Sequence, residues 1–134
     1  MAEVFNNYLV SKQFSSQNES VTIVPIAGGK INDTIGRGSR YGAQSQIHSI
    51  YLTKRNQDSY STNPENDGVD LSVSIYDTAN NKEYFIARYI KVLPNSSFYI
   101  EKTITLTAQD CIRLTYHGST STTIDAVCSG VDLT

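Results

Sequence analysis

Two histidines, His48 and His117, are the side chains of this sequence best suited to acid–base or metal chemistry. His48 lies among alternating apolar residues, so we expect a packed or partly buried ring. His117 precedes Gly118 at a turn, where we expect an exposed ring. Two histidines without a neighbouring cluster of carboxylates lack the ligand set of a zinc site. We therefore expect no catalytic residue, no metal ligand and no cofactor, and a protein that is not an enzyme.

The two cysteines, Cys111 and Cys128, do not form a CxxC pair and fall on what we predict to be the two strands of the last hairpin. One register places them directly opposite each other, where a cross-strand disulfide is conceivable. A register shifted by one residue gives a better apolar face and points the two side chains to opposite faces. We favour the second register and expect two free thiols, with Cys128 inside.

The segment 28–46 is rich in glycine and contains basic residues, but it matches neither a dinucleotide-binding nor a P-loop motif. The net charge of the chain is −2, and only Tyr41 is nearby to stack on a base, so we expect no nucleic-acid partner. A loop of this length is typical of a functional or disordered segment. We expect it to order against a neighbouring subunit, with these candidate partner contacts: Ile31, Ile35, Arg37, Arg40 and Tyr41.

Tyrosine is the abundant aromatic residue, with nine copies and no tryptophan. Tyr60 lies in the polar, acidic segment 56–68, whereas Tyr51, Tyr76 and Tyr99 lie on the less apolar faces of predicted strands. Tyrosine is common at protein interfaces and sugar sites. The alternative interpretation is cross-strand pairing on a solvated sheet, and the absence of tryptophan weakens the carbohydrate interpretation.

The elements that would position these residues are strands. Ser, Thr and Asn supply 39 of the 134 residues, and only 18% are charged, a composition that favours strands over helices. Apolar residues alternate along most of the chain, as in half-buried strands. The predicted strands are 4–10, 21–24, 47–55, 69–77, 84–93, 98–106, 111–116 and 123–131. The stretch 84–93 is apolar on both faces, so we expect it in the middle of a sheet or beneath a partner surface.

This spacing of strands and turns predicts an all-β fold, a single antiparallel β-sandwich that is jelly-roll-like, with about seven or eight strands and two long loops. The sandwich domain spans 20–134, and residues 1–19 form an N-terminal arm or extension. The arm mixes apolar residues with amides, so we expect it to pack against its own sheet or a neighbour's, with Phe5, Tyr8 and Phe14 as candidate partner contacts. No apolar run is long enough for a membrane span and no secretory signal is visible, so we expect no membrane partner.

Five segments, in this order, are similar to a family of small β-rich virion structural proteins of tailed bacteriophages, notably phages of cyanobacteria and other aquatic bacteria. The segments are IHSIYLT (47–53), LSVSIYD (71–77), FIARYIKVLPNSSFYI (85–100), ITLTAQDCIRLTY (104–116) and DAVCSGVD (125–132). VTIVP (21–25) resembles the short strand that precedes them in the family. The two long loops depart from the family's pattern and leave the position on the particle open.

The resemblance implies a non-enzymatic virion structural protein, an accessory capsid-decoration or neck or tail component acting through protein–protein contacts. Its expected partners are other virion proteins and copies of itself, without nucleic acid, membrane or a small-molecule ligand. Its expected location is the virion, after synthesis in the host cytoplasm. The alternative is a carbohydrate- or receptor-binding module on a tail fibre, which would use Tyr60 and the polar segment 56–68.

Overall fold

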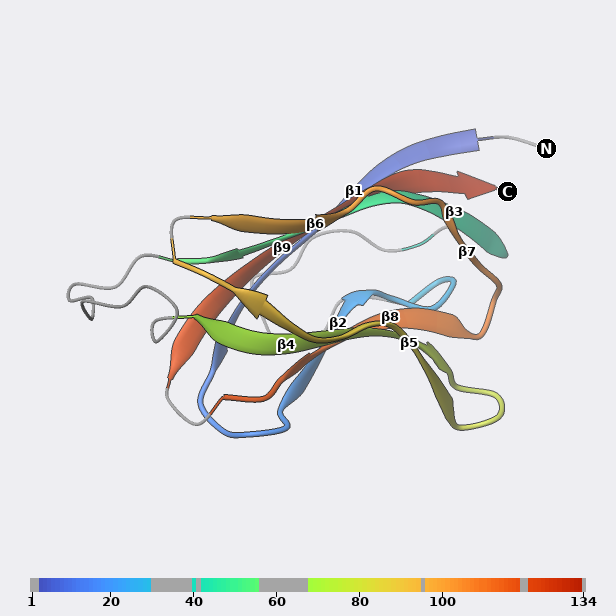
Figure 1. Ribbon diagram of the computed structural model, residues 1–134. Helices are drawn as coiled ribbons and strands as arrows, with labels where there is room; N and C mark the ends of the chain where they lie inside the picture. The colour runs from blue at the N-terminus through green and yellow to red at the C-terminus, as the bar shows by residue number, and fades with distance from the viewer. Residues whose placement is uncertain are drawn as a thin grey trace.

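The computed structural model describes residues 3–29, 40, 42–55, 68–94, 96–118 and 121–133. These residues form two antiparallel sheets that pack face to face, as Figure 1 shows. The strands are β1 (Glu3–Phe14), β2 (Ser20–Val24), β3 (Gln44–Lys54), β4 (Val69–Asp77), β5 (Lys82–Val92), β6 (Ser97–Ile100), β7 (Ile104–Leu106), β8 (Asp110–Tyr116) and β9 (Thr122–Leu133). Among the described residues there is no helix that could cross a membrane.

The first sheet has the strand order β1-β9-β3-β6, with β7 also paired to β3, and the second has the order β2-β8-β4-β5. β6 and β7 pair with different parts of β3, so together they fill one strand position. In both sheets an early strand lies beside a late one, β1 beside β9 and β2 beside β8. This is the arrangement of an eight-stranded jelly roll. The predicted all-β sandwich is confirmed, with nine strand segments in place of seven or eight.

Alternation of apolar and polar residues explains why the strands form where they do. In β4 the side chains of Val69, Leu71 and Val73 are buried, as the spacing predicts. Facing positions of β3, β9 and β8 complete the core between the sheets, with Ile50, Leu52, Ile124, Ala126, Cys128, Ile112 and Leu114. Removing these side chains from water is the main force that holds the two sheets together.

The N-terminal residues pack against the chain's own sheet, which is one of the two predicted outcomes, and they do so as a full strand of the sandwich and not as a separate arm. β1 pairs along its whole length with β9, from Glu3 opposite Leu133 to Phe14 opposite Thr122. Tyr8 and Phe14 are fully buried, and the ring of Phe14 stacks on Tyr116 with centroids 5.2 Å apart. The prediction that Tyr8 and Phe14 contact a partner is therefore wrong, because both rings are used inside the chain's own core.

The predicted final hairpin is also wrong. β8 belongs to the second sheet and β9 to the first, so the chain crosses between the sheets after Tyr116. Cys111 and Cys128 are both buried free thiols and lie in different sheets. Alternation indicates which side chains of a strand face inward, but it does not identify the neighbouring strand in the sheet.

A β-bulge in β3 explains why His48 is exposed and not packed. The pairing of β3 with β9 shifts between Ile47 and Ser49, so the alternation of faces changes phase at His48. The same place separates the part of β3 that pairs with β7 from the part that pairs with β6. One irregularity therefore accounts both for the exposed histidine and for the division of the predicted strand 98–106 into two segments.

β5 is an edge strand of the second sheet and does not run through the middle of one. Tyr84, Phe85 and Tyr89 are exposed on it. The prediction that 84–93 runs through the middle of a sheet is therefore wrong. The alternative, that the strand lies beneath a partner surface, stays a prediction.

Candidate interaction surfaces

Buried polar side chains link β1, β9 and β3 on the inner side of the first sheet. The Tyr8 hydroxyl donates to both carboxylate oxygens of Asp132, at 2.9 and 2.8 Å, and the Ser45 hydroxyl donates to Oδ1. The Asn6 amide donates to Oδ2 at 3.2 Å. Burial and the hydrogen bond to Asp132 raise the pKa of Tyr8 well above its usual value, so the phenol stays a proton donor. Tyr8, Ser45 and Asp132 are all buried, so this network holds strands together and offers no surface to a ligand.

Arg40 is fully buried beside this network. Its Nη1 donates to the backbone carbonyl of Asp110 at 2.9 Å and its Nη2 to that of Thr107 at 2.6 Å, so it holds the turn between β7 and β8. Burial lowers the pKa of Arg40, and Tyr8 and Asp132 oppose that shift. The prediction that Arg40 contacts a partner is wrong, because the guanidinium is used inside the chain.

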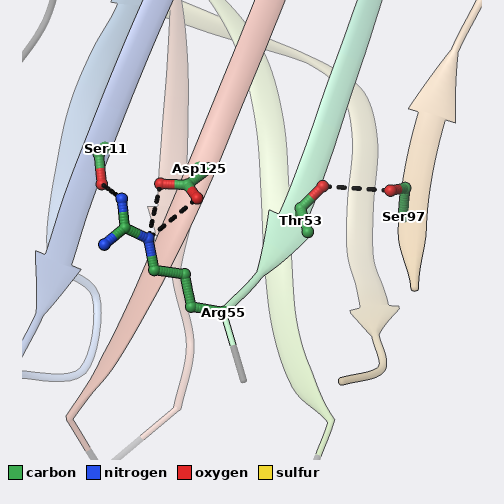
Figure 2. A network of polar contacts seen from close by, with 5 residues as sticks. All are labelled: Ser11, Thr53, Arg55, Ser97 and Asp125. Atoms are coloured by element: carbon green, nitrogen blue, oxygen red, sulfur yellow. Dashed lines mark hydrogen bonds and ion pairs between the residues drawn. The ribbon is translucent and has the colours of Figure 1, made fainter. Parts of the chain in front are cut away.

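A second polar network links the same three strands on the outer side of the first sheet (Figure 2). Arg55 Nε lies 3.2 and 3.0 Å from the two carboxylate oxygens of Asp125, and Arg55 Nη2 donates to Ser11 at 3.1 Å. The hydrogen bond to Asp125 raises the pKa of Arg55. Thr53 and Ser97 share a hydrogen bond of 3.1 Å on the neighbouring strands. Register places Ser11, Asp125, Thr53 and Ser97 in one row across the sheet.

The adjacent row on this outer face is apolar. Leu9 of β1 lies opposite Val127 of β9, Val127 opposite Tyr51 of β3, and Tyr51 opposite Tyr99 of β6. Val127 is 40% exposed and Tyr99 58% exposed, and the two tyrosine rings lie with centroids 5.9 Å apart. The Tyr51 hydroxyl donates to Glu101 at 2.7 Å, which raises the pKa of Tyr51. We call these four residues the transverse row.

On its other side the transverse row is bordered by amide and hydroxyl side chains. Asn7, Ser129 and Ser49 occupy the next row of the same four-stranded face, and Ser129 donates to Asn7 at 2.8 Å. The outer face is therefore an apolar row between two polar rows, which resembles the apolar centre and polar rim of protein interfaces.

Ser72 and His117 have the spacing of a nucleophile and a general base, with Ser72 Oγ 2.7 Å from His117 Nε2. Ser72 is only 1% exposed, and its Oγ also accepts the backbone N–H of Tyr89 at 3.0 Å. Burial lowers the pKa of His117, so the ring is neutral at neutral pH. A substrate would have to displace Tyr89 to reach Ser72, so this pair fixes the conformation of β5 and does not form an open active site.

The structure brings together few of the residues predicted as partner contacts. Phe5 is 80% exposed and lies on the outer face of the first sheet, where it remains available. Ile31, Ile35, Arg37, Tyr41 and Tyr60 lie outside the described residues. In the part of the chain that the structure describes, no group of three or more His, Cys, Asp or Glu side chains could hold a metal ion.

The transverse row was missed because it exists only across four paired strands. The alternation within each strand places Tyr51 and Tyr99 on the less apolar face, which is the only local signal. Leu9 and Val127 join them through pairings of residues that are far apart in the sequence.

No protein-family model matches the chain, and no curated protein matches it in sequence. Among solved structures, the chain is similar to one from a study stating that Bacillus endospore appendages form a novel family of disulfide-linked pili. The two are 10% identical, the alignment covers 98% of this chain and 90% of that chain, and the TM-score is 0.46.

Proposed function

We propose that the chain is a non-enzymatic structural subunit that assembles with copies of itself through the outer face of its first sheet. The transverse row carries this proposal, because it places four apolar side chains next to one another in water across four strands. Isolated exposed apolar residues are ordinary, whereas a contiguous row between polar rows is typical of an interaction surface.

The dimensions and charge of this face suit a contact between identical subunits. The strands β1, β9, β3, β6 and β7 have 12, 12, 11, 4 and 3 residues and cover roughly 650 Å², close to the ~800 Å² that each partner contributes to a standard interface. Asp125 is paired with Arg55, and most other groups beside the row are neutral hydroxyls and amides. The Glu101 carboxylate, which accepts from Tyr51, is the main exception, so the face can meet its own copy about a two-fold axis with little like-charge repulsion.

We further propose that the assembly is the virion of a tailed phage, where the subunit is an accessory capsid-decoration, neck or tail component, synthesised in the host cytoplasm. The resemblance of segments 47–53, 71–77, 85–100, 104–116 and 125–132 to phage virion proteins supports this location. Other virion proteins are then further partners. A cryo-EM map of the particle encoded by the same genome tests the location, and a map without density for this jelly roll would contradict it.

The substitution Val127→Glu tests self-association, because it places a charge at the centre of the transverse row. We expect the wild-type chain to associate with increasing concentration in light scattering, and Val127→Glu to weaken association at least about tenfold. Tyr84→Glu is the matched control, since Tyr84 is also exposed but lies on the second sheet. A wild-type chain that stays monomeric throughout, or a Val127→Glu variant that associates like the wild type, would refute the contact.

The paired rings of Tyr51 and Tyr99 favour a second candidate, the carbohydrate- or receptor-binding module. Two exposed tyrosines beside the Glu101 carboxylate could stack on a sugar and accept hydrogen bonds from its hydroxyls. Saturable binding on a glycan array that is lost in Tyr99→Ala would support this function. Absence of binding to every glycan would eliminate it for the set tested.

A further inference from the structure

Among the described strands, β5 has the most irregular pairing, with two register shifts against β4. Leu71 pairs with Ile90 and Val73 with Ala87, so Arg88 and Tyr89 both lie opposite Ser72. A second register shift follows between Val73 and Ser74. Bulges of this kind redirect side chains at sheet edges.

Tyr89 is held in a left-handed conformation, with φ of 53°, which is uncommon for a residue other than glycine. Its N–H donates to the buried Ser72 hydroxyl, and its ring stacks on His117 with centroids 4.2 Å apart. Ser72 in turn bonds to His117. These three contacts hold a backbone conformation that costs free energy, and such residues cluster at functional sites.

The bulge gathers Arg88 and two aromatic rings at the edge of the second sheet. The guanidinium carbon of Arg88 lies 4.7 Å from the centroid of the Phe85 ring and 5.6 Å from that of Tyr89. Arg88 is exposed, and within the described part of the chain no carboxylate bonds to it. By contrast, Arg55 is paired with Asp125, and Lys91 lies 3.6 Å from Asp70. Arg88 is therefore a guanidinium that is oriented by two rings but lacks a counter-charge there.

We propose that Arg88, oriented by Phe85 and Tyr89, is a binding site for a carboxylate of an acidic segment on a partner protein. A guanidinium presents parallel N–H donors that match both oxygens of a carboxylate. Stacking on the rings fixes the plane of those donors in advance, so less side-chain entropy is lost on binding. β5 carries Lys82, Arg88 and Lys91 against Glu83, so its formal charge is +2 in a chain of net charge −2.

The geometry favours a carboxylate on a protein over a sugar or a strand. A sugar ring binds by stacking on an open aromatic face. The ring of Tyr89 is already in contact with Arg88 and His117, and the ring of Phe85 with Arg88, so the cluster presents the N–H donors of Arg88 instead. A straight strand cannot pair with an edge that is bulged twice. Exposed Arg and Tyr side chains are enriched among the residues that contribute most to protein–protein binding. The inference deepens the proposed function by naming a second contact of the same subunit.

An NMR titration of the full chain tests this site, with a hexaglutamate peptide as the probe and the Arg88 Nε–Hε resonance as the reporter. We expect a saturable shift at Arg88 that weakens as salt is added. Arg88→Gln and Arg88→Lys should each lower the affinity at least about fivefold, because Lys lacks the planar pair of donors. Lys82→Gln, which removes a charge from the same strand away from the rings, should change it less than twofold.

The His117 ring resonances in the same spectra report whether the stack on Tyr89 survives in each variant. No binding by the wild type, or equal binding by Arg88→Gln, would overturn the site. Arg88-dependent binding of polygalacturonate or polyphosphate without binding of hexaglutamate would overturn the protein partner. Val127→Glu should bind hexaglutamate normally and Arg88→Gln should self-associate normally, so the two proposals fail separately.

Discussion

The two polar networks of the first sheet differ in burial although they link the same strands. Each contains one carboxylate on β9. Asp132 accepts directly from Tyr8 of β1 and Ser45 of β3. Asp125 is bonded by Arg55, which follows β3, and Arg55 in turn donates to Ser11 of β1. The inner network is buried, and the outer one lies in water. Both networks tie a β9 carboxylate to the neighbouring strands, so their main difference in energy is expected to come from burial, which changes the free energy lost when a partner is removed.

Exposure to solvent determines how much free energy of unfolding is lost when a hydrogen-bond partner is removed. A buried donor or acceptor without a partner carries its full desolvation cost, whereas an exposed one bonds to water instead. The inner network should therefore determine stability, and the outer one should mainly order side chains on the interaction surface.

Asp132→Ala should produce the largest effect. It leaves the Tyr8 and Ser45 hydroxyls without their shared acceptor and removes a negative charge near the buried Arg40. We expect the free energy of unfolding to fall by about 3–5 kcal/mol, measured by urea denaturation. A loss below about 1 kcal/mol would mean that burial does not distinguish the two networks.

Tyr8→Phe should produce an intermediate effect, since it removes one hydrogen-bond donor and keeps the ring. We expect a loss of about 1.5–3 kcal/mol at neutral pH. Because the pKa of Tyr8 is raised in the folded chain, its contribution is present below the unfolded pKa of about 10 and declines as pH rises above it. Stability of the wild type should thus fall more steeply above pH 10 than that of Tyr8→Phe, and parallel curves would contradict this assignment.

Asp125→Ala should produce the smallest effect. Arg55 is highly exposed and water replaces its partner, so we expect a free energy of unfolding indistinguishable from that of the wild type in the same urea titration. A clear loss that disappears in high salt would show that the outer network also stabilises the fold.

The sequence predicts local structure well where alternation is unbroken. The strand 69–77 has the bounds of β4, and Val69, Leu71 and Val73 are buried as the spacing indicates. Ser72 and Ser74 on the opposite face are buried as well, which the alternation does not predict.

Prediction of burial fails where a side chain bonds to residues distant in the sequence, or where a β-bulge reverses the alternation of inward and outward positions. Arg40 is buried because carbonyls of Thr107 and Asp110 accept its donors, and His48 is exposed because one residue is inserted into the pairing of β3. Neither fact has a local signal.

The position of β9 also sets the order in which the described strands can join during folding. β9 follows the other eight strands in the chain, yet it lies between β1 and β3 (Figure 1). Until β9 emerges from the ribosome, β1 has no neighbour in its sheet, and Tyr8 has no Asp132 to bond. Contacts between the two ends of a chain close slowly, so this jelly roll should fold only after synthesis of its last strand, on the millisecond-to-second scale of all-β domains.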